Sequence, residues 1–191
     1  IDADGLTSAA VAATALRRAA IPFETAFAKQ LDAAEIDRIA ATDHDTVLFT
    51  DFGSGQLDLI APHADAGAFT PVVVDHHQPA DLPETDGPEF HLNPLLFGID
   101  GAAELSGAGA SYVLARALEP PGGDNRDLAG LAVVGATGDM QATDGGLSGA
   151  NRRIVEEGVA AGVVEEATDL LVYGRQTRPL PKLLEYANDV R

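Results

Sequence analysis

Carboxylate and imidazole side chains border several apolar segments of this chain. They are Asp2, Asp4, Asp51, Asp75, His76, His77 and Asp139. Several oxygen ligands with one or two imidazoles suit Mn²⁺ or Mg²⁺, and suit Zn²⁺ less well. So many acids around one point also require a compensating charge of about +4, because like charges disfavour ionisation. We therefore expect two divalent cations, the arrangement that proteins use for in-line displacement at phosphorus.

The same residues also have a purely structural interpretation. Aspartates at the end of a strand often cap the helix that follows, and this alone would account for Asp2, Asp4 or Asp51. Asp139 has a neighbour, Asp144, in the same glycine-rich turn, which competes for its place. If the metal interpretation holds, Asp51 or Asp139 can bridge ions roughly 3.5–4 Å apart, because a carboxylate has two oxygens.

The elements that must bring these side chains together follow two alternating patterns. Short, mostly apolar runs predict strands over 22–29, 46–51 and 71–77. Helix-like stretches occupy 5–20, 32–41 (capped by Asp32), 55–64, 107–119, 125–137, 150–161 and 180–188. This alternation indicates an α/β fold, with a doubly wound, mainly parallel sheet flanked by helices and a helical second half. Segments 80–90 and 119–125, rich in Pro, Gly and Asp, are interpreted as surface loops.

Such a sheet explains how residues far apart in the sequence can converge. In an open parallel sheet, ligands bind at the carboxyl ends of the strands, near the topological switch point. Asp51 and the triplet 75–77 end two of the strands, so they are expected at that edge. The segment "TDHD" (42–45) has a metal-like composition but precedes its strand, so we expect a solvated loop at the opposite edge. His63, on a helix, is expected to be structural or exposed.

The charge of the chain narrows the class of protein to which it can belong. Thirty acidic residues face twelve basic ones, only two of them lysine, and the net charge is −18. Because a hydrophobic content of 46% argues against disorder, we interpret the chain as a folded protein adapted to high salt, with an ordinary acidic protein as the alternative. Cysteine is absent, which excludes disulfides and thiolate ligands. With neither a membrane-spanning run nor a secretion signal, we expect a cytoplasmic protein.

Four motifs, "DADGLTSA", "TDFG", "VDHHQP" and "GD", occur in the order found in the DHH phosphoesterase superfamily. The chain resembles the RecJ-like single-strand exonuclease branch of archaea, in its haloarchaeal form. The similarity continues through "HLNPLLFGIDG", "SGAGASYVLARAL" and "GLSGANRRIVEEGV", and it implies one DHH-type catalytic domain over 1–191. The family pattern also implies a further ligand just before Ile1 and a glycine-rich DHH-associated domain after Arg191, so we expect both to lie outside this sequence.

The resemblance assigns roles at the metal centre. Asp2 resembles a ligand of the first ion, whereas Asp4 and His76 resemble ligands of the second. Asp51 and Asp139 correspond to carboxylates shared between the ions. Two Mn²⁺ or Mg²⁺ ions are therefore the implied cofactors, and a water that they activate is the implied nucleophile.

The resemblance also implies residues that act on the substrate. Asp75 would fix the orientation of the His76 imidazole. His77 would face the scissile phosphate and donate a proton or a hydrogen bond to it. Further candidates for substrate contacts are His91, Asn93, Ser106, Gly107 and Arg152. For 106–111 the phosphate would be bound by backbone N–H groups at a helix N-terminus, and tight packing of small residues is an equal alternative; for Arg152 the alternative is a surface salt bridge.

Three functions follow as hypotheses. The first, implied by the resemblance, is a metal-dependent exonuclease of DNA repair type that degrades single-stranded DNA or RNA from an end. The second is an oligoribonuclease or nucleotide bisphosphate phosphatase that acts on short oligonucleotides. The third is a non-catalytic replication scaffold, which the intact ligand set disfavours. A replication partner such as the GINS complex is compatible with an active enzyme. Few aromatic residues (5%) and no basic stripe are present for binding nucleic acid.

Overall fold

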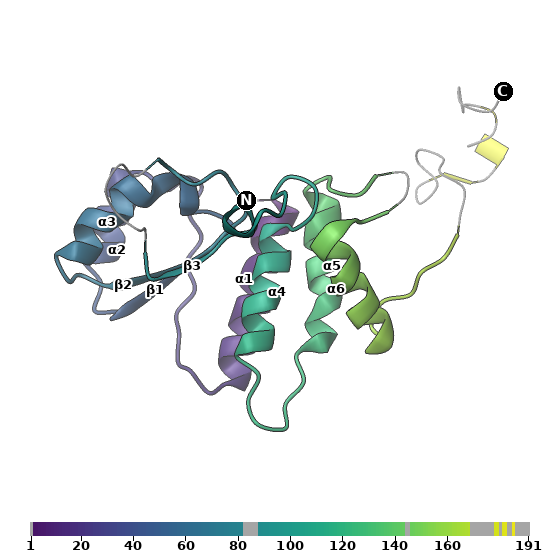
Figure 1. The fold of residues 1–191 in the computed structure, drawn as a ribbon, viewed down its shortest axis with the longest axis horizontal. Coiled ribbons are helices and arrows are strands. Elements are labelled where there is room, and N and C mark those ends of the chain that lie inside the picture. Colours follow the sequence, from purple (N-terminus) through teal and green to yellow (C-terminus); the bar gives the residue numbers. More distant parts are fainter. Residues whose placement is uncertain are drawn as a thin grey trace.

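The sheet is short and entirely parallel. The structure is a computed structural model, and it describes residues 2–81, 88–143, 146–168, 178–179, 181–182 and 185. Its strands are β1 (Thr46–Thr50), β2 (Thr70–Val74) and β3 (Phe90–Leu92), paired in the order β1-β2-β3. Helices cover both faces of this sheet (Figure 1), so the predicted α/β class with a parallel, helix-flanked sheet is confirmed.

One face of the sheet packs against two short helices, α2 (Ala33–Ala40) and α3 (Leu57–Asp65). As predicted, Asp32 caps α2, because its carboxylate accepts the Glu35 backbone N–H at 3.0 Å. The buried side chains of this layer are Leu31, Ile36, Phe49, Leu57, Ile60, Phe69 and Val73. Neighbouring strand residues such as Leu48 and Val74 belong to the core on the opposite face, because successive side chains of a strand point to opposite faces.

The other face packs against α1 (Ala3–Arg18) and α4 (Gly107–Ala117), two of the longer helices of the molecule. On their far side lie α5 (Ala129–Gly138), which packs against both, and α6 (Gly149–Ala160), which packs mainly against α5; the four helices lie side by side in Figure 1. Small residues allow close packing between them, and those buried include Ala12, Ala15, Ala108, Ala110, Ala129 and Ala132. The structure therefore confirms the predicted helical second half, and α1 joins that layer although it comes first in the sequence.

One predicted strand is wrong. Residues 22–29 form no strand, and most of their side chains are exposed, including Phe27 at 54%. Their apolar residues do not reach the core, so the segment gains nothing from joining the sheet. The third strand is instead β3, which pairs with β2 and lies at the margin of a segment predicted to be a loop. The predicted helix over 180–188 and most of the loop over 80–90 fall largely outside the described residues, as does Asp144.

Several other expectations can be compared with the structure. Asp43, His44 and Asp45 are exposed and precede β1, at the edge of the sheet away from the carboxyl ends of the strands, as expected. His63 is partly exposed and its Nε2 lies 3.3 Å from an Asp37 oxygen. Among the described residues, no helix is both long and apolar enough to cross a membrane.

Candidate metal centre

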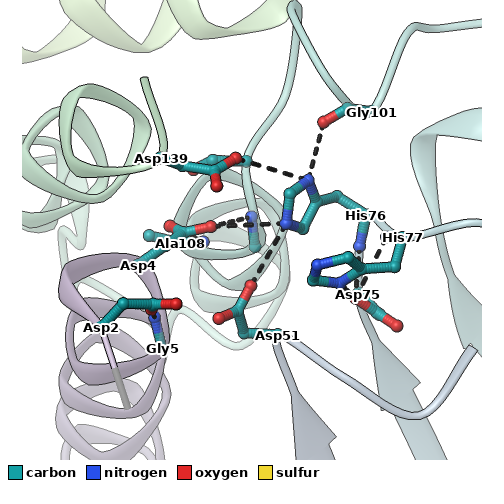
Figure 2. Close-up of polar contacts among 12 residues, drawn as sticks. Asp2, Asp4, Gly5, Asp51, Asp75, His76, His77, Gly101, Ala108 and Asp139 are labelled. Atoms are coloured by element: carbon teal, nitrogen blue, oxygen red, sulfur yellow. Dashed lines mark hydrogen bonds and ion pairs between the residues drawn. The ribbon is translucent and has the colours of Figure 1, made fainter. Parts of the chain in front are cut away.

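The predicted acids and imidazoles of the strand ends meet side chains from the helical layer. Two groups of residues have candidate ligand atoms that all lie within 4.8 Å of one another. They are Asp51, Asp75, His76 and His77 in one group and Asp4, His76 and Asp139 in the other. Figure 2 shows Asp4, Asp51 and Asp139 around the ring of His76, which belongs to both groups. The cluster thus lies where the sheet meets α1, α4 and α5.

His76 is buried and has a defined orientation. Its Nδ1 lies 2.7 Å from the Gly101 carbonyl oxygen, and because a carbonyl only accepts, Nδ1 carries the proton. The Nε2 atom therefore faces the acids, at 3.3 Å from Asp51 Oδ1 and 3.6 Å from Asp4 Oδ2. Burial alone would lower the pKa of His76, but the Asp51 and Asp4 carboxylates and the Gly101 carbonyl raise it to about 9. An imidazole nitrogen aimed at two carboxylates is suited to share a cation with them.

Asp51 is the least satisfied carboxylate of the cluster. It follows β1 in a left-handed conformation, with φ 64°, which aspartate tolerates better than most residues. In the described part of the chain, its buried Oδ1 has no hydrogen-bond partner. Burial, and then the nearby charge of Asp4, raise the pKa of Asp51 to about 6, against the opposing effect of His76. A Cβ at position 107 would lie 2.2 Å from Asp51 Oδ1, so Gly107 leaves the space that this oxygen occupies.

Asp4 is bound by the N-terminus of α4. The Gly107 N–H donates to Oδ2 at 2.8 Å and the Ala108 N–H donates to Oδ1 at 2.9 Å. The backbone N–H groups proposed to bind a phosphate through Ser106 and Gly107 are therefore directed at a carboxylate of the centre. The Ser106 hydroxyl oxygen accepts the Gly109 N–H and caps the helix. In this structure the donors of this segment orient Asp4, and a phosphate contact through Ser106 or Gly107 stays a prediction.

Asp2 lies at the border of the cluster. It is exposed, and its Oδ1 caps α1 by accepting the Gly5 N–H at 2.9 Å, as the structural interpretation expected. A Cβ at Gly5 would lie 3.1 Å from Asp51 Oδ2 and 3.5 Å from Asp2 Oδ1, so these two carboxylates flank one point. The two oxygens of Asp51 thus face different neighbours, with Oδ1 toward His76 and Oδ2 toward Asp2.

Asp139 ends α5, and its side chain is 34% exposed. Its Oδ2 lies 3.9 Å from His76 Nδ1 and accepts a hydrogen bond from Gln141 Nε2 at 2.9 Å. The next residue, Met140, has φ 59°, and this left-handed turn ends the helix. Strain of this kind often accompanies functional sites; here it occurs beside Asp139 and at Asp51.

Asp75 and His77 form a separate pair beside the cluster. Asp75 is fully buried, and its oxygens accept from the Ser54 N–H at 2.9 Å, the His76 N–H at 2.7 Å and the His77 N–H at 3.2 Å. The His77 Nδ1 also donates to Asp75, at 2.8 Å. Burial would raise the pKa of Asp75, but the hydrogen bonds of His77 and Ser54 lower it to about 2. The imidazole that Asp75 orients is therefore that of His77, whereas His76 is oriented by Gly101.

The other predicted substrate contacts have structural partners. Asn93 is fully buried, and its Nδ2 donates to Ser54 Oγ at 2.9 Å and to the His77 carbonyl oxygen at 2.8 Å. His91 lies within β3, with its Nε2 2.8 Å from Ser54 Oγ. Both residues thus support the loop that carries His77, and a substrate contact through either residue stays a prediction. Arg152 does not contact the cluster, because its guanidinium pairs with Glu156 and Glu166.

Sequence reasoning missed several residues that hold the cluster. They are Ser54, Gly101, Ala108, Gln141 and Asn151. Most act through backbone groups, which leave no signal in residue type. Glycine is required at position 101 for a steric reason, since a Cβ there would lie 2.1 Å from the His76 carbonyl oxygen. The sequence signal that could have identified Gln141 is its position in "GDMQ", two residues after Asp139.

The donor set of the cluster fits a divalent cation. Its oxygen and imidazole atoms are ligands for hard or borderline ions such as Mn²⁺, Mg²⁺ or Zn²⁺. The ion pairs recorded among the described residues of the cluster join carboxylates only to imidazoles, so the acids have no lysine or arginine to neutralise them. The buried Asp51 Oδ1 has no hydrogen-bond partner in the described part of the chain, as expected of an atom that binds a cation. These residues could therefore hold metal.

Two comparisons with known proteins extend this description. The family model described as "DHH family, N-terminal domain" matches residues 1–136. The chain is also 33% identical, over 160 residues, to an uncharacterized protein of Methanocaldococcus jannaschii, and the match covers 82% of the chain and 34% of that protein. The chain thus spans about a third of the length of this curated relative.

Proposed function

Because this chain belongs to the DHH family, whose members are metal-dependent phosphoesterases, we propose that its acidic centre hydrolyses phosphodiesters of single-stranded nucleic acid from an end. We propose Mn²⁺ or Mg²⁺ as the cofactor, with two ions bound. The observation that carries this proposal is the convergence of Asp4, Asp51 and His76 around one buried Asp51 oxygen that has no hydrogen-bond partner among the described residues. Residues 1–191 would form the catalytic part of the enzyme.

The surroundings of Asp51 support a shared carboxylate. Its Oδ1 faces His76 and Asp4, and its Oδ2 faces Asp2 across Gly5. Asp4 and His76 would then hold one ion and Asp2 the other, with Asp51 between them and Asp139 completing the set. When bound, the ions would polarise the phosphate ester and lower the pKa of water near neutrality.

His77 is the proposed group that acts on the phosphate. Its side chain is 58% exposed, and its Nδ1 is fixed by the buried Asp75, so Nε2 is the atom available to a substrate. The hydrogen bond to Asp75 raises the pKa of His77. A protonated Nε2 can donate a hydrogen bond, or a proton, to a phosphate oxygen as negative charge develops.

The charge of the chain bears on how a polyanion would bind. Five arginines of the described residues pair with carboxylates outside the centre, namely Arg18, Arg38, Arg116, Arg126 and Arg152. Phosphate affinity would therefore rest on the metal ions rather than on counterion release. We expect binding of a single strand to depend weakly on salt when metal is present, as suits a protein adapted to high salt. A steep loss of affinity between low and high salt would contradict this.

A second substrate class is favoured by the same pairing of the arginines. The paired arginines leave no continuous row of free basic side chains in the described part of the chain to follow a long strand. Short oligonucleotides or nucleotide bisphosphates are therefore the second proposed substrate class, because they need few phosphate contacts. The full-length protein should be offered long single strands and dinucleotides at equal concentrations. Faster hydrolysis of the long strand supports the exonuclease, and faster hydrolysis of the dinucleotide supports the oligoribonuclease alternative.

The proposal is tested by removing the metal and the shared carboxylate in turn. The full-length protein should hydrolyse a labelled single strand with Mn²⁺, lose this activity in excess chelator, and lose it again in the Asp51→Ala variant. Hydrolysis that persists in Asp51→Ala would overturn the assigned centre. A protein that is inactive on every phosphoester but still binds replication proteins such as GINS would instead be a scaffold.

A further inference from the structure

We propose that Gln141 is a positioning residue that sets the geometry of two metal ligands at once, Asp139 directly and His76 through the Gly101 carbonyl. This inference rests on the metal centre proposed above. It concerns a residue that would not itself bind an ion, and whose effect on metal affinity would come entirely through its hydrogen bonds.

The amide group of Gln141 lies between the two ligands. The side chain is 3% exposed, and its Nε2 donates to the Gly101 carbonyl oxygen at 2.8 Å and to Asp139 Oδ2 at 2.9 Å. The same Gly101 oxygen accepts the His76 Nδ1–H at 2.7 Å. Both amide hydrogens of Gln141 are thus used, one on a ligand and one on the carbonyl that orients the other ligand.

The orientation of this amide is fixed from a third element. Asn151, on α6 and 1% exposed, donates from Nδ2 to Gln141 Oε1 at 2.6 Å. If the Gln141 amide were flipped, its oxygen would face the Gly101 carbonyl and the Asp139 carboxylate, and the Asn151 donor would meet an N–H group. Asn151 therefore selects the single orientation that can donate to the metal ligands.

The backbone explains why Asp139 and Gln141 act together. Helix α5 ends in a Schellman motif, in which the Met140 N–H donates to the Thr137 carbonyl at 3.1 Å and the Gln141 N–H donates to the Ala136 carbonyl at 3.0 Å. Met140 supplies the left-handed residue that this motif requires, and its side chain is 78% exposed. The turn thus directs Met140 outward while Asp139 and Gln141 contact each other.

A positioning role makes a prediction that a merely structural role does not. Groups that orient metal ligands typically change metal affinity about 10- to 100-fold when they are removed. They also set which nitrogen of a histidine carries the proton. If Gln141 only filled space, its loss would lower stability and leave both properties unchanged.

The test measures Mn²⁺ binding to the full-length protein by the electron paramagnetic resonance signal of free Mn²⁺. Gln141→Met keeps the side-chain length and removes the hydrogen bonds, so we expect Mn²⁺ affinity to fall about 10- to 100-fold. The matched control is Asn125→Ala, which removes another fully buried amide that donates to the Ala115 carbonyl, away from the centre. It should lower stability while Mn²⁺ affinity stays within about twofold of the wild type.

A second variant and a second measurement keep the test decisive if Gln141→Met does not fold. Asn151→Asp has the same shape but cannot donate to Gln141 Oε1 when ionised, and it should also weaken Mn²⁺ binding. In the metal-free protein, at a pH well above the His76 pKa of about 9 where the ring is neutral, ¹⁵N spectra of the imidazoles should show His76 protonated on Nδ1 in the wild type and a mixture of tautomers in the variants.

The outcomes separate the two proposals. Wild-type Mn²⁺ affinity and an unchanged His76 tautomer in the variants that fold would overturn the positioning role and leave the metal centre intact. A wild-type protein that binds no Mn²⁺ would overturn the proposed function itself. Weakened binding in Gln141→Met and in Asn151→Asp, with Asn125→Ala unaffected, supports the positioning role.

Discussion

Asp51 and Asp75 occupy equivalent positions on adjacent strands and have opposite surroundings. Each follows the last residue of its strand, and the Asp51 N–H donates to the carbonyl of Val74, the residue before Asp75. Asp75 accepts hydrogen bonds from Ser54, His76 and His77; burial would raise its pKa, but the bonds from His77 and Ser54 lower it to about 2. The buried Oδ1 of Asp51 has no hydrogen-bond partner in the described part of the chain, and burial raises the pKa of Asp51 to about 6.

The difference shows that a carboxylate at a strand end can either support neighbouring groups or bind a cation. A carboxylate whose oxygens are all satisfied is a support, because no lone pair is directed at open space. A buried carboxylate without donors is costly alone, and becomes favourable only with a cation. The left-handed conformation of Asp51 accompanies this difference, since its side chain lies beside Gly107 rather than beside the N–H groups of the next loop.

The largest expected effect comes from Asp51→Asn. Hydrolysis with Mn²⁺ should fall about 10³-fold or more, because metal coordination contributes several kcal/mol to such a transition state. Stability of the metal-free protein should move the other way and rise by roughly 1–3 kcal/mol at neutral pH, since a buried charge is removed. The penalty that Asp51 imposes is absent below its ordinary pKa of 3.8 and grows as pH rises through about 6. A hydrolysis assay with Mn²⁺ measures the loss of activity, and urea unfolding of the metal-free proteins measures the gain in stability. A metal-free variant less stable than the wild type would contradict the comparison.

The next effect concerns His77. His77→Gln should lower the turnover number about 10²-fold, as loss of a proton or hydrogen-bond donor commonly does, and should leave Mn²⁺ affinity unchanged. The matched control is His63→Gln on α3, remote from the centre, which should alter neither quantity. If His77→Gln abolished Mn²⁺ binding, His77 would be a ligand rather than a group that faces the substrate.

Asp75→Asn should have a smaller effect on hydrolysis and a clear effect on stability. A pKa lowered from 3.8 to about 2 corresponds to roughly 2 kcal/mol of stability at neutral pH, which the variant would lose. Because the folded-state pKa is depressed, this stability is present above pH 3.8 and is lost as pH falls through about 2. The difference between wild type and variant in urea unfolding should therefore shrink toward acid pH. A loss of Mn²⁺ binding as complete as that of Asp51→Asn would show that the two aspartates do not differ as described.

Gly5→Ala should have the smallest effect. A Cβ there would lie 3.1 Å from Asp51 Oδ2, so the carboxylate must shift by a few tenths of an ångström, while Asp75 is untouched. Mn²⁺ affinity should fall slightly, and the free energy of unfolding should change by less than about 1 kcal/mol. Calorimetric titration measures the Mn²⁺ affinity of this variant and of the control Gly130→Ala on α5, where a Cβ would make only an ordinary van der Waals contact. Equal Mn²⁺ affinity in the two variants would mean that Asp51 Oδ2 is not a ligand.

The sequence was informative where residue type and position within an element coincide. Strand ends at Asp51 and at 75–77 were readable because apolar runs define strands, and parallel strands share one carboxyl edge. The hydrogen-bond partner of each side chain could not be predicted from the sequence. Asp75 was expected to orient the His76 imidazole, but the loop after β2 places His77 Nδ1 at 2.8 Å from Asp75 and leaves His76 to the Gly101 carbonyl.

Burial and backbone groups also determine partners that residue type does not reveal. Asn93 has the residue type of a substrate contact, but it is fully buried against Ser54. The N–H groups at the start of α4 are anion binders, as expected, but the anion is Asp4 from a segment about a hundred residues away in the sequence. Residues 22–29 have the apolar pattern of a strand, but they form none and most of their side chains remain exposed, because a pattern alone does not bring a segment to the core.

The account is tested most directly by locating manganese in crystals of the full-length protein grown with Mn²⁺. Anomalous difference maps at the manganese edge should show two neighbouring peaks, with Asp51 between them, Asp4 and His76 at one, and Asp75 at neither. Maps without a peak among these side chains, or with manganese bound to Asp75, would contradict it.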